Sequence, residues 1–263
     1  MHFTKMQGLG NDYVYLDCTE SVPENLPELA KKVSNRDYSI GSDGLICICA
    51  SYVADFRMRM FNADGSEGEM CGNGIRCVGK FVYDKGLTRH KTITVETGAG
   101  IKMLMLHVVD GSVQSVTVDM GKPVTTPVCT ISVKGEDYDV LPVSMGNPHI
   151  VLFLKDIDSL DLPEIGPVFE NHPQFPDRTN TEFVEVLSPT HLKMRVWERG
   201  SGETRACGTG ACATLVAAAL SGHSARAATV SLLGGDLHIH WEKKNNHVYM
   251  TGSAVTVFEG ELE

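Results

Sequence analysis

The chain of 263 residues is 42% apolar and 21% charged, a composition typical of a globular protein with room for one large or two medium domains. Its formal net charge of −10 argues against nucleic acid or an anionic membrane as the main partner. Since no apolar run reaches the roughly 18 residues of a membrane span and the first residues lack the layout of a signal peptide, we expect a cytoplasmic protein.

The first half of the chain predicts several strands and one long helix. Residues 5–12 are expected to form a glycine-rich turn, and 24–34 a short helix with one apolar face. A longer helix follows Cys71 and should end by Gly86, because glycine commonly terminates helices. Strands are predicted, in chain order, over 13–16, 45–50, 56–61, 92–96, 101–109 and 114–120.

The second half predicts the same succession of elements. A helix rich in Ala and Leu follows Cys207 and should end by Gly222, whereas 161–177, rich in Pro and acidic residues, is expected to be a surface loop. Strands are predicted over 150–154, 183–187, 191–197, 228–233, 236–242 and 246–250.

The two halves match each other at an offset of 136 positions. The residues that coincide are Asn11 with Asn147, Asn62 with Glu198, and Cys71 with Cys207, and the turn at 41–44 has its counterpart at 177–180. Such long-period similarity predicts a tandem duplication of about 115–135 residues per half, each made of strands around one helix. The alternative is a chance match between glycine-rich turns.

Each half places a cysteine directly before a Gly-x-Gly helix start. The helix dipole and the first backbone N–H groups of a helix favour a thiolate there, and they can bind a ligand carboxylate or phosphate. If both helix ends held one carboxylate, Cys71 and Cys207 would lie on the two sides of its α-carbon. One thiolate could then remove the α-proton while the opposite thiol returned a proton to the other face, which inverts the carbon.

Other interpretations of the cysteines compete with this one. The eight cysteines lie at positions 18, 47, 49, 71, 77, 129, 207 and 212, without the Cys-x-x-Cys spacing of zinc sites, so we predict no metal. Gly208, Gly210 and Ala213 fit a dinucleotide-binding pattern, although ten residues separate it from the preceding strand. Two further alternatives are acyl transfer by a cysteine paired with His149, and inert thiols in the core.

Seven segments together resemble the diaminopimelate epimerase family. They cover nearly the whole chain and lie at 8–12, 61–66, 71–77, 146–149, 178–180, 197–204 and 206–210. The resemblance implies a cofactor-independent epimerase with two cysteine bases that interconverts LL- and meso-2,6-diaminopimelate in lysine biosynthesis.

The resemblance also implies the architecture. The fold class is α/β (α+β), with two pseudo-symmetric domains, each a curled, mostly antiparallel sheet around a central helix, and the active site between them. By analogy, residues 1–113 with 253–263 form the N-terminal domain and 114–252 the C-terminal domain. We expect a homodimer that works without pyridoxal phosphate.

The resemblance assigns roles residue by residue. The catalytic set is Cys71, Cys207, His149 and Glu198, in which the cysteines are the acid/base pair and the other two position or polarise the thiols and the reacting amine. Amides that bind the reacting carboxylate are those of Gly72, Asn73, Gly208 and Thr209. The remaining substrate-binding residues are Asn62, Asn180 and Arg199 at the distal amino-acid end, Glu198, and Asn11 and Asn147, which line the site.

Two rival functions remain. A proline or hydroxyproline racemase also uses two cysteines, but its substrates have no distal amino-acid head for Arg199 and its neighbours to bind. A non-catalytic amino-acid binder would not need both thiols, so a proton-exchange assay separates it from an epimerase.

Overall fold

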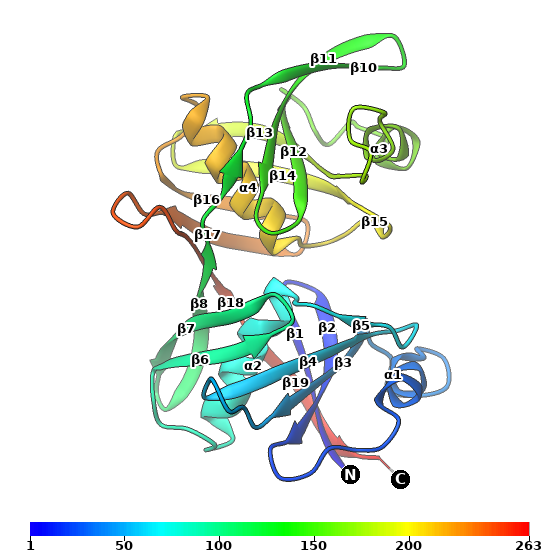
Figure 1. Ribbon diagram of the computed structural model, residues 1–263, viewed down its shortest axis with the longest axis vertical. Helices are drawn as coiled ribbons and strands as arrows, with labels where there is room; N and C mark the ends of the chain where they lie inside the picture. The colour runs from blue at the N-terminus through cyan, green and yellow to red at the C-terminus, as the bar shows by residue number, and fades with distance from the viewer. Residues whose placement is uncertain (263) are drawn as a thin grey trace. The chain divides into compact units, whose positions relative to one another are not determined.

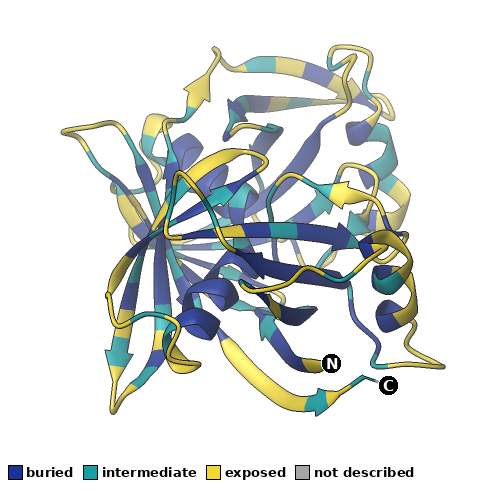
Figure 2. Cartoon of the chain, turned by 60° about the horizontal axis from the view of Figure 1, so that its bottom comes forward, coloured by how far each residue is buried: buried dark blue, intermediate teal, exposed yellow. Residues whose placement is uncertain are grey.

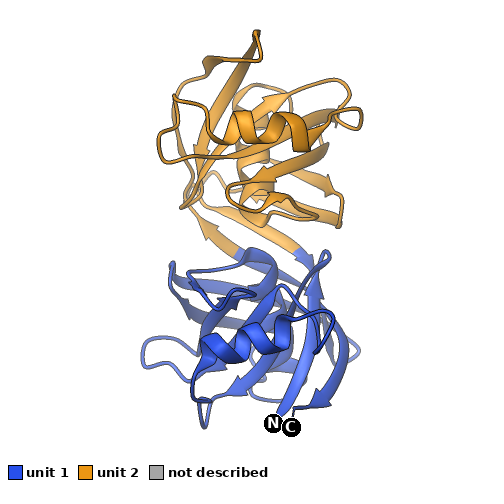
Figure 3. Ribbon diagram, turned by 90° about the vertical axis from the view of Figure 1, so that its right-hand side faces the viewer, with its two compact units in different colours: residues 1–118, 252–263 blue, residues 119–251 orange. Residues whose placement is uncertain are grey.

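The computed structural model of the protein describes residues 1–262, which form four helices and nineteen strands (Figure 1). The chain divides into two compact units, unit 1 with residues 1–118 and 252–263, and unit 2 with residues 119–251 (Figure 3). It leaves unit 1 within β8 (Ser112–Gly121) and returns at the end of β18 (Val248–Ser253). Glu263, which we assigned to the first domain, lies outside the described residues. No helix within 1–262 is long and apolar enough to cross a membrane.

Unit 1 is a curled sheet around helix α2 (Gly72–Asp84), with α1 (Leu26–Ser34) packed on its outside (Figure 1). Its pairings are antiparallel except for β2 with β3 and β4 with β6, which are parallel. Besides the first part of β8, its strands are β1 (His2–Gly8), β2 (Asn11–Cys18), β3 (Gly44–Cys49), β4 (Phe56–Asn62), β5 (Glu67–Gly68), β6 (Thr92–Thr97), β7 (Gly100–Val109) and β19 (Val255–Glu261).

Unit 2 repeats this plan around helix α4 (Gly208–Leu220), with α3 (Leu162–Glu170) as the outer helix (Figure 1). Its parallel pairs, β12 with β13 and β14 with β16, occupy the equivalent places. Besides β18, its strands are β9 (Val124–Thr125), β10 (Cys129–Val133), β11 (Glu136–Ser144), β12 (Pro148–Phe153), β13 (Asn180–Ser188), β14 (His191–Glu198), β15 (Gly202–Glu203), β16 (Ala227–Leu232) and β17 (Gly235–Trp241). The expected α/β class, with a mostly antiparallel sheet around a central helix in each half, is confirmed.

The two central helices form the core of their units. Ile75, Val78 and Val82 of α2 are fully buried, as is most of α4, whose Ala- and Leu-rich sequence is apolar on every side (Figure 2). A helix that is apolar all round has to be enclosed, which is why the sheet curls about it. Both helices end where expected, because Gly86 and Gly222 adopt left-handed φ values of 79° and 74° directly after the helix caps.

The prediction of a glycine-rich turn over 5–12 is wrong. Only Leu9 and Gly10 form a turn, with φ values of 57° and 83°, while β1 runs through Gly8 and β2 begins at Asn11. β1 pairs with β2 on one side and with β19, from the other end of the chain, on its other side. Because this second pairing is made with residues some 250 positions away, no local pattern could indicate it.

The prediction of a surface loop over 161–177 is also wrong, because α3 lies within it. Asp161 caps this helix by accepting a hydrogen bond from the backbone N–H of Glu164, at 3.2 Å, and a proline occupies its first turn. Leu162 and Phe169 are fully buried. At Gly166 an added Cβ would lie only 2.2 Å from the Trp197 ring, so glycine permits this close packing.

The correct helix positions extend the internal repeat. Each of the four helices begins and ends 136 positions from its counterpart, since α1 corresponds to α3 and α2 to α4. The sequences Leu-Pro-Glu-Leu at 26–29 and Leu-Pro-Glu-Ile at 162–165 carry the same correspondence. The repeat, applied to the predicted helix over 24–34, would have located α3.

Arg76 is a buried cation in the core of unit 1, with no exposed surface. Its guanidinium donates to the carbonyl oxygens of Gly72, at 3.0 Å, and Ser253, at 3.1 Å, and to Asn73 Oδ1, at 3.1 Å. Arg76→Met should remove these three hydrogen bonds and lower the free energy of unfolding by about 2–4 kcal/mol, as measured by urea denaturation.

Arg89→Met serves as the matched control, since Arg89 is an exposed arginine of the same unit. It should change the free energy of unfolding by less than about 0.5 kcal/mol. Equal effects of the two substitutions would show that the contacts of Arg76 do not stabilise unit 1.

Candidate functional site

Cys71 is the N-cap residue of α2. Its Sγ accepts a hydrogen bond from the backbone N–H of Gly74 at 3.3 Å, and its thiol donates to Asn11 Oδ1 at 3.1 Å. Glycine at position 74 lets the first turn of α2 pack closely against β3, because an added Cβ would lie 2.7 Å from Ile46 Cδ1. The thiol is half-buried and therefore accessible at the start of the helix.

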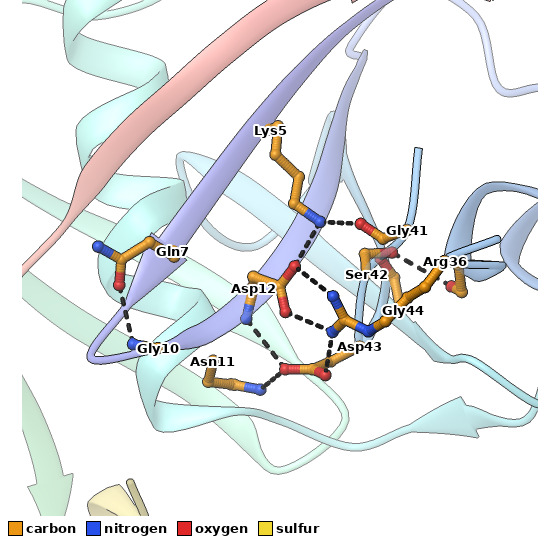
Figure 4. Close-up of polar contacts among 11 residues, drawn as sticks. Lys5, Gln7, Gly10, Asn11, Asp12, Arg36, Gly41, Ser42, Asp43 and Gly44 are labelled. Atoms are coloured by element: carbon orange, nitrogen blue, oxygen red, sulfur yellow. Dashed lines mark hydrogen bonds and ion pairs between the residues drawn. The ribbon is translucent and has the colours of Figure 1, made fainter. Parts of the chain in front are cut away.

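A network of charged residues holds Asn11 in place (Figure 4). Asp43 Oδ2 accepts from Asn11 Nδ2 at 2.7 Å and from the backbone N–H of Asp12 at 3.0 Å. Arg36 donates to both carboxylates, and Lys5 forms an ion pair with Asp12. Since Asp43 takes the amide nitrogen of Asn11, the amide oxygen is left to face the Cys71 thiol.

This network also sets the charge of Asp12. Burial alone would raise the pKa of the Asp12 carboxyl, but hydrogen bonds and charges from Arg36 and Lys5 outweigh it and lower the pKa. The carboxylate therefore stays ionised and keeps the two cations in place beside β2.

Three further predicted site residues belong to unit 1. Gly72 and Asn73 form the first turn of α2, where Asn73 is buried and its side chain accepts from Arg76. Asn62 ends β4 and donates to Ser66 Oγ at 3.0 Å within the following turn. The structure thus places Asn11, Cys71 and the first turn of α2 together, while the Asn62 side chain contacts its own turn.

Cys207 is the N-cap residue of α4 and is only 4% exposed. Its Sγ accepts from the backbone N–H of Gly210 at 3.4 Å and lies 3.5 Å from Thr209 Oγ1. Burial raises the pKa of this thiol well above its usual range, and the charges of Glu198 and Glu182 raise it further. These effects outweigh the stabilisation of a thiolate by the first N–H groups of α4, so Cys207 is a neutral thiol in the resting protein.

Glu198 lies at the end of β14 and is half-buried. Desolvation raises the pKa of its carboxyl, against the hydrogen bonds from Thr204 and Cys207 that lower it. Glu198 therefore lies next to Cys207, in an environment that disfavours the ionised form of its carboxyl.

His149 lies in the interior of unit 2 in contact with two residues. Its Nδ1 is 2.7 Å from Glu182 Oε1, and neither side chain has any exposed surface. Its Nε2 is 3.1 Å from Asn147 Oδ1, and Asn147 Nδ2 lies 3.4 Å from Thr209 Oγ1. Asn147 thus connects His149 to the first turn of α4, next to Gly208 and Cys207.

Asn180 and Arg199 lie next to each other in unit 2. Asn180 Oδ1 accepts from the backbone N–H of Arg199 at 2.9 Å, and its amide nitrogen donates to the Pro148 carbonyl at 2.7 Å. The exposed Arg199 side chain donates to the carbonyl oxygen of Asp177 at 3.0 Å. Asn180 thereby fixes the backbone from which the Arg199 guanidinium extends.

Glu170 stabilises the turn at Arg199 and Gly200, and the sequence analysis did not identify it. This buried carboxylate at the end of α3 accepts from Trp197 Nε1 at 2.7 Å and from the Gly200 N–H at 2.8 Å, and it pairs with Arg178. Because 161–177 was predicted to be a loop, nothing indicated that Glu170 is buried. Asp43 and Glu182 were missed for a similar reason, since each acts through a contact with a residue 32 or 33 positions away in the chain.

The two half-sites have a common chemical plan. In each unit a cysteine caps the start of the central helix, and the positive end of the helix dipole favours an anion there. Beside each helix start lies an asparagine, Asn11 at the beginning of β2 and Asn147 directly before β12, and these two strands precede the outer helices. Within residues 1–262, no group of three or more His, Cys, Asp or Glu side chains is placed to hold a metal ion.

Comparison with known proteins points to one family. A profile of the family described as diaminopimelate epimerase matches residues 3–126 and 141–257. The diaminopimelate epimerase of Acetivibrio thermocellus is 58% identical over 276 residues, covering 100% of this chain and 99% of that protein. The diaminopimelate epimerase of Methanococcus maripaludis is 55% identical, with 100% of both chains covered.

Solved structures with similar folds are more distant in sequence. A phenazine biosynthesis protein of the PhzF family from Bacillus anthracis has a TM-score of 0.78 at 18% identity, with 100% of this chain and 99% of that chain covered. A hydroxyproline epimerase from Agrobacterium vitis has a TM-score of 0.72 at 14% identity, with 100% and 90% covered. At these identities the similarity concerns the fold alone.

The difference between the two cysteines predicts unequal reactivity. At pH 7.5, iodoacetamide should alkylate Cys71 at least about tenfold faster than Cys207, because Cys207 is buried and its raised pKa leaves little thiolate. Peptide mapping by mass spectrometry over a time course measures both rates.

The denatured protein is the control, since both cysteines should then react at similar rates. Alkylation of Cys207 in the folded protein should keep rising above pH 9, as its thiolate forms only there. Faster labelling of Cys207 at pH 7.5 would contradict the charge environment described for α4.

Proposed function

Because the chain belongs to the diaminopimelate epimerase family, we propose that it interconverts LL- and meso-2,6-diaminopimelate by inverting one α-carbon. The observation that carries the proposal is the pair of cysteine-capped helix starts, one in each half of an internal repeat. Inversion needs one proton-transfer group for each face of the carbon, and the repeat supplies two equivalent thiols.

The proposed reaction is a pair of proton transfers. A cysteine thiolate takes the α-proton, so that the C–H bond breaks and an S–H bond forms, and the opposite cysteine thiol gives its proton to the other face. Cys207 rests as a neutral thiol, which is the form required of the proton donor. In the reverse direction, Cys71 and Cys207 exchange roles.

The carbanion between these steps is too basic to form without stabilisation. We assign that role to the backbone N–H groups of Gly72, Asn73, Gly208 and Thr209, which would bind the reacting carboxylate and the charge that develops on it. Preorganised N–H donors act most strongly where water is excluded, and the burial of Cys207 is consistent with such a site.

The other predicted site residues are proposed to recognise the rest of the substrate. Asn62, Asn180 and Arg199 would bind the distal amino-acid end, in which Arg199 pairs with the carboxylate that does not react. Asn11 and Asn147 would line the site beside the two thiols. His149 and Glu198 would adjust the charge around Cys207 and the reacting amine.

We further propose that units 1 and 2 act as the N-terminal and C-terminal epimerase domains, that no cofactor is needed, and that the reaction serves lysine biosynthesis in the cytoplasm.

We also propose a homodimer, for which β19 is a candidate surface. This strand exposes Val255, Val257 and Phe258 (Figure 2). Analytical ultracentrifugation measures the oligomeric state directly.

Isotope exchange tests the proposed reaction. In heavy water containing a chelator, the protein should convert LL-diaminopimelate to the meso form with deuterium at the inverted α-carbon and no pyridoxal absorbance. Cys71→Ala and Cys207→Ala should each lower kcat/KM by at least about 10²-fold, because each removes a proton-transfer group.

Cys129→Ala is the control, since Cys129 is a half-buried thiol on β10 outside both helix starts, and it should keep full activity. Loss of activity on chelation that zinc restores would overturn the two-thiol mechanism. Racemisation of proline as readily as diaminopimelate would overturn the substrate assignment.

Arg199→Met tests the distal half of the substrate site. Loss of the guanidinium should leave the distal carboxylate unpaired, at a cost of about 2–5 kcal/mol, and lower kcat/KM for diaminopimelate between about 30-fold and several thousand-fold. Both thiols should keep their reactivity toward iodoacetamide, which shows that the helix starts are intact.

Lys243→Met removes a positive charge from an exposed turn of the same unit and should leave kcat/KM unchanged. If Arg199→Met also retained near-normal kcat/KM, Arg199 would not bind the distal carboxylate.

A further inference from the structure

The internal repeat allows the two half-sites to be compared position by position. At an offset of 136, His149 corresponds to Tyr13, and Glu182 corresponds to Ile46. The backbone around them is equivalent, since β2 pairs with β3 in parallel as β12 does with β13. The two units therefore have the same backbone at these positions but different side chains, Tyr13 and Ile46 in unit 1 and His149 and Glu182 in unit 2.

The side chains at 46 and 182 occupy the same place beside the central helix. A Cβ added at Gly74 would lie 2.7 Å from Ile46 Cδ1, and one added at the equivalent Gly210 would lie 2.6 Å from Glu182 Oε1. Ile46 and Glu182 both have no exposed surface. Both thus pack against the first turn of the helix that begins at the cysteine.

Burying Glu182 costs free energy that burying Ile46 does not. A carboxylate without exposed surface loses its hydration, and its Oε2 has no hydrogen-bond partner among the described residues. Ile46 shows that the scaffold accepts an apolar side chain at this position. Since buried ion pairs are often no more stabilising than apolar residues of similar size, stability does not explain Glu182.

The contacts of His149 show what the carboxylate does. The two ring nitrogens of His149 both lie opposite acceptors, Glu182 Oε1 at 2.7 Å and Asn147 Oδ1 at 3.1 Å. The Asn147 amide nitrogen is directed to Thr209, so its oxygen is the atom that meets the ring. A neutral imidazole donates from one nitrogen only, whereas an imidazolium donates from both.

We propose that Glu182 is a positioning residue that holds His149 as an imidazolium, and that this charge gives the half-site of Cys207 a cation at the position where the half-site of Cys71 has Tyr13. The Nδ1–H donates to Glu182 and the Nε2–H donates to Asn147. The assignment of protons needs only the geometry of unit 2, while its part in catalysis rests on the proposed epimerase function.

The proposed cation acts on the charged groups around it. Glu182 on β13, Glu198 at the end of β14 and Cys207 at the start of α4 act on one another electrostatically, and all three become negative when they ionise. An imidazolium among them offsets their mutual repulsion. It thereby lowers the free energy of the Cys207 thiolate, which must form whenever Cys207 removes a proton.

Nuclear magnetic resonance of the whole protein labelled with ¹⁵N-histidine tests the proton assignment without any activity measurement. The signals of His149 are assigned by their loss in His149→Gln. At pH 7.5, both ring nitrogens of His149 should have the shifts of protonated nitrogen in the wild type. Only Nε2 should in Glu182→Gln, because the Asn147 oxygen still accepts from Nε2 while the new amide group can donate to Nδ1. A neutral His149 in the wild type, or an unchanged imidazolium in Glu182→Gln, would overturn the proposal.

Kinetics test the consequence for the reaction. Glu182→Gln should lower kcat on the order of 10- to 100-fold in both directions with little change in KM, because the charge acts on proton transfer and not on substrate contacts. Glu182→Asp, which keeps the charge, should restore part of kcat. Glu185→Gln on the same strand is the control and should leave both the His149 signals and kcat unchanged.

Failure of this proposal and failure of the epimerase function give different results. If the wild type shows an imidazolium but no α-proton exchange with diaminopimelate, the epimerase function fails and the charge assignment stands. If exchange occurs and His149 is neutral, only the assignment fails. Were Glu182→Gln not to fold, the wild-type spectrum alone would still decide the protonation of His149.

Discussion

The rest of the candidate site depends on one hydrogen bond in each unit, which the backbone N–H of the third residue of the central helix donates to a cysteine sulfur. In both units this bond, from Gly74 to Cys71 and from Gly210 to Cys207, makes the cysteine the N-cap residue of the helix. Enclosure of the helix by the sheet then fixes where the thiol and the first N–H groups lie. Glycine at the third position allows close packing, because an added Cβ would lie within 3 Å of the end of a side chain on the neighbouring strand.

The same scaffold carries two different electrostatic environments. Around Cys71, a network of Arg36, Asp43 and Asn11 reaches the thiol through a neutral amide, and the strand behind the helix start presents Ile46. Around Cys207, burial of the thiol and then the charges of Glu198 and Glu182 raise its pKa. The proposed inversion needs a thiol for each face of the carbon, but it does not require the surroundings of the two thiols to be equivalent, and those of Cys71 and Cys207 differ.

Residues that are not proposed to contact the substrate hold the candidate site of unit 2 in place. Glu170, at the buried end of α3, holds the turn that follows β14 through Trp197 and Gly200, and that turn bears Glu198 and Arg199. Asn180 fixes the Arg199 backbone from the neighbouring strand. The outer helix of unit 2 therefore contributes to the candidate site by placing residues, without supplying a proposed substrate contact.

The sequence by itself determined the repeat, the central helices, most strands and the cysteine-capped helix starts, because periodicity, glycine stops and capping patterns act over a few residues. It also contained the match of 26–29 with 162–165 that locates α3. Only the tertiary structure decided that β1 pairs with β19, that Asp43 holds Asn11 and that Glu182 meets His149. These contacts depend on the register between strands that are distant in the chain, and a shift of one residue would turn each side chain to the other face.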